Sequence, residues 1–270
     1  MARYLNDCGA LIQHIPRTGG TWIEKVIGML GIKHMKWLEK QPLWLPRKHS
    51  LYQHYYRNQL DRIKYIFSTI RHPKAYYESQ WKWLCRETDR SSLVNDWRWH
   101  PQAVAAKWFM EIGGRDGMFD DWVVLMTEKE PMWYTRLVEN YVGPEGGEFV
   151  DFIARTETLS QDFYTFLELM GYDMDKFHEY TDVHGTKVFE VARINVATAT
   201  IWWSPDTEAR VMNMERMVIE RFYEKEDRCY ASLAEKAPVR WNYAKREAYL
   251  KRRARERSSK TYDKSTREAS

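Results

Sequence analysis

Near the start of the chain, a cation, two adjacent glycines and two threonines stand together between two hydrophobic segments. These residues are Arg17, Thr18, Gly19, Gly20 and Thr21, within the stretch "HIPRTGGTWIEKVIGMLG". Adjacent glycines let a backbone close around an oxyanion without a Cβ in the way. The guanidinium and the threonine hydroxyls add charge and hydrogen-bond donors. The pattern predicts a phosphate-binding loop, although it lacks the G-K-[ST] ending of the common nucleotide-binding loop.

Such a loop needs a strand before it and a helix after it, because the first turn of a helix aims its N–H groups and dipole at a bound anion. The apolar run Gly9–Pro16 ends at a proline and predicts a buried strand. Beyond the loop, apolar residues recur at helical spacing as far as Leu30, and Gly31 marks the end of the helix. We therefore expect a strand, a tight turn and a helix.

A second apolar run, Ile63–Ile70, predicts another strand, directly followed by Arg71. Pro73 suits the first turn of the next helix, and Ser79 lies on that helix, eight residues after Arg71. An arginine at a strand end and a hydroxyl on the following helix make a second candidate anion site.

Further along the chain, strands and helices continue to alternate. The run Glu148–Ala154 predicts a third strand, and Thr158 with Gln161 has the spacing of a capping box at the start of the next helix. Ser204 is expected to cap one more helix that runs from Pro205 to about residue 230. This alternation favours an α/β fold with a central parallel sheet flanked by helices on both faces.

The first of these motifs resembles a known family. "PRTGGTW" is similar to the 5′-phosphosulfate loop, P-K-[ST]-G-[GT]-T-[SW], of the sulfotransferases that use 3′-phosphoadenosine 5′-phosphosulfate (PAPS), with Arg17 where that family usually has Lys. "IRHPKAYYESQW" matches the family's 3′-phosphate segment in spacing and context. The resemblance implies a P-loop-type three-layer fold and PAPS as sulfuryl donor, with PAP as product and without a metal. The donor-binding residues that it implies are Arg17, Thr18, Gly19, Gly20, Thr21, Trp22, Arg71 and Ser79.

A third match is softer. "DFIARTETLSQDF" resembles the segment "DFIGRFENLEEDF" of the carbohydrate-type and bacterial branch of the family. Its polar members, Arg155 and Glu157, are interpreted as a structural ion pair beneath the site. The resemblance runs from about Gly9 to Tyr230, nearly the whole of a single domain that we assign to residues 1–244.

Sulfuryl transfer to a hydroxyl requires a base for the acceptor's proton and stabilisation of the departing phosphate. Histidine is the natural base near neutral pH. Related sulfotransferases take their base from the region that here reads "PRKHSLYQHY", so His49 is the catalytic base that the resemblance implies. His54 is the nearest competitor, and Glu24 stays open as a carboxylate base. Arg17 is the second expected catalytic residue, because it faces the leaving group, with Lys48 as a possible helper.

The overall charge of +4 is unevenly distributed. Residues 245–270 carry ten basic and four acidic side chains, which leaves the rest of the chain close to neutral. We interpret this segment as a basic tail, partly helical or disordered. The three widely spaced cysteines predict neither a disulfide framework nor a zinc site. Neither a signal peptide nor a membrane span is apparent, which favours a cytoplasmic protein.

Two other classes of function stay open. A P-loop kinase would share the phosphate-binding loop but would bind ATP with Mg²⁺. A non-catalytic protein that holds RNA or another anion through its basic tail is the third interpretation, although nucleic acid is not the expected partner. The acceptor is expected to be a hydroxyl-bearing (or amine-bearing) sugar or small molecule. The aromatic-rich stretch from Tyr76 to Pro101 either lines its cleft or forms a helical core.

Overall fold

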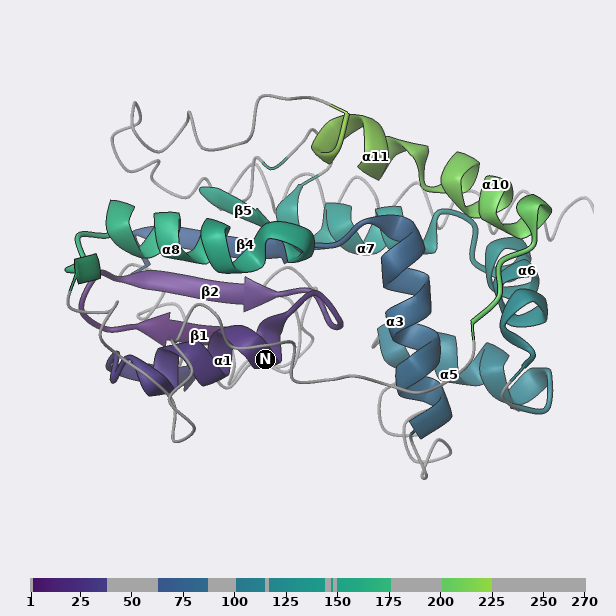
Figure 1. Cartoon of the computed structure of the whole chain (residues 1–270), viewed down its shortest axis with the longest axis horizontal. Coiled ribbons are helices and arrows are strands. Elements are labelled where there is room, and N and C mark those ends of the chain that lie inside the picture. Colours follow the sequence, from purple (N-terminus) through teal and green to yellow (C-terminus); the bar gives the residue numbers. More distant parts are fainter. Residues whose placement is uncertain are drawn as a thin grey trace, which may run out of the picture.

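The computed structural model describes residues 2–37, 63–86, 101–114, 117–143, 147, 150–175 and 201–224. Its fold is α/β: a five-stranded sheet is flanked by helices (Figure 1). His49, His54, Lys48 and the basic tail lie outside the described residues.

The strands are ordered β3-β1-β2-β4-β5 across the sheet. Their bounds are Ala2–Leu5 (β1), Ala10–His14 (β2), His34–Trp37 (β3), Tyr65–Ile70 (β4) and Phe152–Arg155 (β5). The three predicted strands are β2, β4 and β5, and they run parallel to one another, with Ile12 opposite Phe67 and Phe67 opposite Phe152. Their carboxyl ends therefore meet at one edge, as the predicted phosphate loop requires.

The predicted parallel sheet is only part of the observed sheet, which is mixed. β1 pairs antiparallel with both β2 and β3. Each of these two strands has four residues, and β1 carries the charged Arg3. Neither contains the longer apolar run by which a buried strand is recognised in a sequence.

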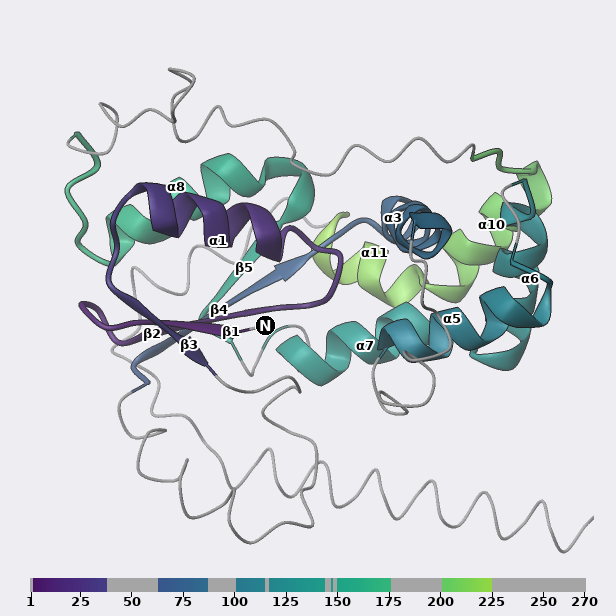
Figure 2. The ribbon, with the colours of Figure 1, turned by 90° about the horizontal axis from the view of Figure 1, so that it is seen from below.

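The described helices are α1 (Gly20–Met29), α3 (Pro73–Arg86), α5 (Pro101–Glu111), α6 (Phe119–Lys129), α7 (Trp133–Val142), α8 (Leu159–Leu169), α10 (Pro205–Met214) and α11 (Arg216–Phe222). α1 and α8 cover one face of the sheet and α7 lies on the other (Figure 2). α3, α5, α6 and α10 lie beyond the carboxyl ends of the parallel strands (Figure 1). These helices form a separate helical layer beside the sheet (Figure 1).

The predicted helix starts are confirmed at α1, α3 and α8, but one cap differs. Thr158 does precede α8, yet its side chain makes no capping bond to the helix backbone. Its hydroxyl donates instead to Asp162 Oδ2 at 2.9 Å, and the same oxygen accepts from the Arg155 N–H at 2.8 Å. Asp162 thus joins the end of β5 to the start of α8, and the predicted capping box with Gln161 does not form.

The predicted helix after Ser204 is two helices. Ser204 caps the first as expected, since its Oγ accepts from the Thr207 N–H at 3.2 Å. The helix then breaks at Glu215, which separates α10 from α11. The Glu215 carboxylate is fully buried and accepts hydrogen bonds from the Tyr134 and Thr135 N–H groups at the start of α7. This distant contact, which the sequence pattern does not reveal, holds the break in place.

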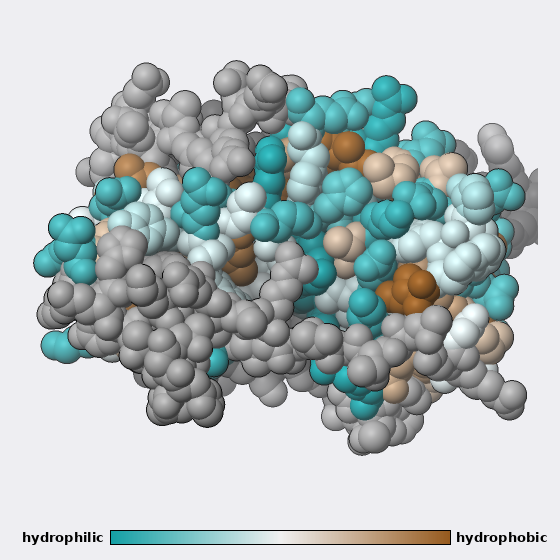
Figure 3. Space-filling model, viewed as in Figure 1, coloured by the Kyte–Doolittle hydropathy of each residue, from teal (hydrophilic) through white to brown (hydrophobic). Residues whose placement is uncertain are grey.

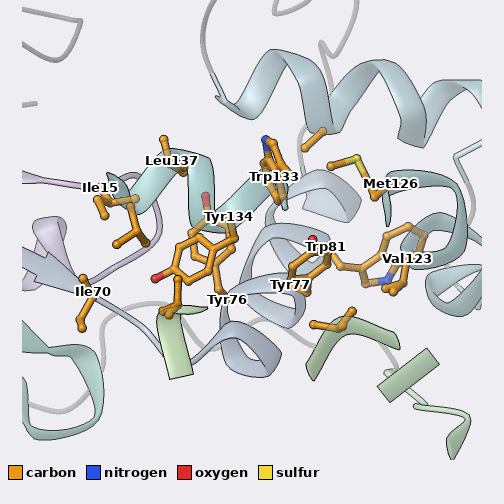
Figure 4. Close-up of a cluster of buried hydrophobic side chains, with 14 of the residues drawn as sticks. Ile15, Ile70, Tyr76, Tyr77, Trp81, Val123, Met126, Trp133, Tyr134 and Leu137 are labelled. Carbon is orange, nitrogen blue, oxygen red and sulfur yellow. The ribbon is translucent and has the colours of Figure 1, made fainter. Parts of the chain in front are cut away.

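The described start of the aromatic-rich stretch is a helix whose largest side chains lie mostly in the core. Tyr76, Tyr77, Trp81 and Leu84 of α3 are all fully buried in one cluster with side chains of α6 and α7 (Figure 4). The described surface on the side seen in Figure 1 is mostly hydrophilic, with small separated apolar patches (Figure 3). For residues 76–86, the helical-core interpretation is the correct one.

Candidate anion-binding site

The loop after β2 is tightly folded and conformationally constrained. The Thr18 N–H donates to the Ile15 carbonyl at 3.2 Å, and the Gly19 carbonyl accepts the first bonds of α1. Gly19 has a φ of 98°, and Arg17, which has a side chain, adopts a φ of 73°. Non-glycine residues rarely adopt a positive φ, and such strain concentrates where a binding site requires it.

Glycine is required at position 20 because of its neighbour in β2. A Cβ on Gly20 would lie 2.2–2.3 Å from atoms of the His14 ring. The ring of His14 thus takes the space beside the first turn of α1.

Thr18 and Thr21 have different environments. The Thr18 side chain is completely buried, and its hydroxyl donates to the Ile15 carbonyl at 2.6 Å and lies 2.5 Å from Thr69 Oγ1 on β4. Both donors of Thr18 are therefore used within the loop, and the contact with Thr69 joins the loop to the neighbouring strand. Thr21 is exposed in the first turn of α1, where N–H groups lack partners within the helix.

The two sequence motifs meet at the strand ends. Arg17 Nη2 donates to Ser79 Oγ at 3.3 Å, and Arg71 Nη1 donates to the Arg17 carbonyl at 3.1 Å. Arg17 and Ser79 are 62 positions apart in the chain. The fold thus brings together the predicted 5′-phosphosulfate residue and both predicted 3′-phosphate residues.

Positive charge accumulates at this point, where Arg17 lies near both Arg71 and Arg86. Burial is the main cause that lowers the pKa of Arg17 to about 10, and the neighbouring cations Arg86 and Arg71 lower it further. Arg17 Nε is buried and has no hydrogen-bond partner within the described part of the chain. A half-buried, strained arginine beside two other cations favours binding of an anion.

Arg71 is held at both of its main-chain polar groups by one side chain. Its N–H donates to the Tyr134 hydroxyl at 2.8 Å, and the same hydroxyl donates to its carbonyl at 2.7 Å. Thr156, after β5, donates its hydroxyl to the Ile70 carbonyl at 2.8 Å. Tyr134 belongs to the site although no sequence motif singled it out, because the tyrosine stands in an ordinary amphipathic helix 63 positions away.

Trp22 follows the loop but is largely enclosed. It is 9% exposed and meets Phe163 of α8 edge-on, with ring centroids 6.1 Å apart. The indole thus anchors α1 to α8. Its expected stacking near adenine stays a prediction.

Arg155 and Glu157 do not pair with each other, contrary to the expected ion pair. The Arg155 guanidinium lies 5.1 Å from the centre of the Tyr223 ring, and Glu157 Oε2 accepts from the Tyr223 hydroxyl at 3.1 Å. Glu157 Oε1 accepts from the His72 N–H at 2.9 Å. Both residues therefore fasten α11 to the strand ends beside Arg71.

The candidate bases are only partly within the described residues. Glu24 forms an ion pair with Arg3 across α1 and β1. His72, a further histidine directly after Arg71, has a pKa that burial lowers, and its ring meets Tyr223 edge-on with ring centroids 5.1 Å apart. His49 and His54 fall in a range of which nothing is described.

Comparison of the chain with protein families, with curated proteins and with solved structures finds no match. Helices with the length and apolar character needed to cross a membrane are also absent from the described ranges.

Proposed function

We propose that this chain is a PAPS-dependent sulfotransferase with a P-loop-type three-layer fold. The observation that carries the proposal is the convergence of Arg17, Arg71 and Ser79 at the carboxyl ends of parallel strands. The motifs that contain them resemble the two phosphate-binding segments of that family, which lie far apart in the sequence. Their contact in the fold is what a donor with two phosphate groups requires.

In the proposed complex, the loop from Arg17 to Trp22 holds the 5′-phosphosulfate, and Arg71 with Ser79 holds the 3′-phosphate. The Ser79 hydroxyl accepts a hydrogen bond from Arg17, and its proton has no acceptor among the described residues. That proton is therefore available to a phosphate oxygen. Arg17 supplies a charged hydrogen bond to the same anion, which is stronger than a neutral one.

The proposed reaction is an in-line transfer to an acceptor hydroxyl. The acceptor oxygen forms a bond to sulfur, the bond from sulfur to the 5′-phosphate oxygen breaks, and PAP leaves. His49 takes the acceptor's proton, and Arg17 with the N–H groups that open α1 stabilises the charge on the departing phosphate.

Calorimetric titration tests the proposal against the kinase alternative. PAP should bind in the presence of EDTA and raise the melting temperature, since a ligand at a hundredfold excess over its Kd stabilises a protein by about 2.7 kcal/mol. ATP with Mg²⁺ should stabilise the protein far less. Stabilisation by ATP–Mg²⁺ but not by PAP would replace the proposed sulfotransferase with a kinase.

A further inference from the structure

Tyr76 on α3 carries a polar atom for which the described fold supplies no partner. Its side chain is completely buried, and its hydroxyl has no hydrogen-bond partner among the described residues. Tyr77, the next residue, is equally buried, but its hydroxyl donates to Glu215 Oε1 at 2.9 Å. Since a buried hydroxyl without a partner is costly, the difference between these neighbours requires an explanation.

The Tyr76 ring is fixed relative to Arg71. It stacks on Tyr134 with ring centroids 3.9 Å apart and planes 19° apart, and it also contacts Trp133 at 5.5 Å (Figure 4). The Tyr134 hydroxyl in turn binds both main-chain polar groups of Arg71. The orientation of the Tyr76 hydroxyl is therefore set by the same contacts that hold the loop after β4.

The position of Tyr76 on α3 also relates it to Arg17. Residues three apart on a helix share a face, and Ser79, three positions after Tyr76, accepts the Arg17 hydrogen bond. Arg17 and Arg71 both act electrostatically on the Tyr76 hydroxyl. Burial nevertheless dominates and raises the pKa of Tyr76 far above its usual range, so the phenol keeps its proton and can donate it.

We propose that the Tyr76 hydroxyl donates a hydrogen bond to an oxygen of the phosphate or sulfate group that Arg17 and Arg71 bind. The inference rests on the proposed function, because it concerns the same donor site. A neutral donor suits this place, since another cation beside Arg17, Arg71 and Arg86 would add charge repulsion. The anion would in turn supply the partner that the buried phenol lacks.

The test compares three full-length proteins: wild type, Tyr76→Phe and Tyr77→Phe. Each is titrated calorimetrically with inorganic pyrophosphate and with PAP, and each is melted without ligand. Tyr76→Phe should bind both ligands roughly tenfold to a hundredfold more weakly, as expected for loss of a hydrogen bond to a charged group. Its melting temperature without ligand should not fall. The control, Tyr77→Phe, should show the reverse: lower stability and unchanged affinity.

Equal affinities of wild type and Tyr76→Phe would overturn the inference. So would a lower melting temperature of Tyr76→Phe without ligand, because the hydroxyl would then bond within the protein. If wild type binds pyrophosphate but not PAP, the proposed function fails, and the pyrophosphate titrations still decide the role of Tyr76. If wild type binds neither ligand, both proposals fail.

Discussion

At the scale of single residues, Arg17 concentrates the properties of the site. It combines a positive φ, partial burial, a hydrogen bond to Ser79 and two cationic neighbours. The positive φ, the burial of charge and the cationic neighbours each lower the stability of the protein without a ligand. Their coincidence at one residue is understandable if a bound anion compensates for the charge.

His49 gives the residue-scale prediction. A general base contributes about 10²–10⁴ in rate and little to donor affinity. His49→Ala should therefore lose turnover by that factor in a labelled-PAPS assay with a screened acceptor, while its affinity for PAP stays within about twofold. The rising limb of kcat with pH, near a pKa of about 6–7, should disappear in the variant.

His54→Ala serves as the matched control, since it removes a histidine five positions away in the same segment. Near-normal turnover of His49→Ala would exclude it as the base. Glu24 would then be the next residue to replace. Thermal melting of that variant would first show whether loss of the ion pair with Arg3 lowers stability.

At the scale of elements, the start of α1 depends on a small residue that meets β2. Gly20→Ala should destabilise the fold by about 1–3 kcal/mol, the usual cost of overpacking, because its Cβ would collide with the His14 ring. It should also weaken PAP binding.

Gly28→Ala on the same helix is the control: its Cβ would meet nothing within 4 Å. It should stabilise by about 0.5–1 kcal/mol through helix propensity. Equal stability of the two variants in urea denaturation would show that His14 does not constrain the loop.

The junction between α10 and α11 gives a second prediction at this scale. Glu215→Ala would leave Tyr77, Tyr134 and Thr135 with unpaired buried donors. At about 1–3 kcal/mol per unsatisfied group, the loss of stability should reach about 3 kcal/mol or more. Glu220→Ala removes only an exposed ion pair with Arg216 and should cost no more than about 0.5 kcal/mol. Similar denaturant midpoints for the two variants would contradict the role of Glu215.

The pH dependence of Glu215 has a definite sign. Burial is the main cause that raises its pKa above the ordinary value of 4.5, despite hydrogen bonds that lower it. The folded state thus favours the protonated form, and this contribution to stability is complete below about pH 4.5 and lost as the pH rises through the folded pKa. The unfolding free energy of wild type minus that of Glu215→Gln should therefore decrease with rising pH. A constant or increasing difference would contradict a raised pKa of Glu215 in the folded protein.

At the scale of the whole molecule, the sequence predicted what local patterns encode. The three parallel strands, the starts of α1, α3 and α8, and the cap at Ser204 follow from apolar runs, proline positions and capping residues. The antiparallel strands β1 and β3 were not predicted, because the pattern of a four-residue strand is too short to recognise. The break at Glu215 was not predicted either, because it depends on a contact with Thr135, 80 positions away in the chain.

In the candidate site, too, some residues could be predicted from the sequence and others could not. Arg17, Arg71 and Ser79 could be found from motif spacing, and the fold then brings them into contact. The contacts of Tyr134 could not be predicted from the sequence, because they depend on how α7 packs against α3 and the loop after β4. The contact that joins Thr18 to Thr69 on another strand likewise could not be predicted from the sequence.

The central claim is that this edge of the sheet holds both phosphates of one nucleotide. The most direct test is calorimetric titration of wild type and Arg71→Ala with PAP and with AMP, which lacks the 3′-phosphate. Wild type should prefer PAP, and Arg71→Ala should lose about 1.5–3 kcal/mol of PAP binding, the value of a charged hydrogen bond, with little change for AMP. Equal losses for PAP and AMP, or no preference for PAP in wild type, would contradict the account.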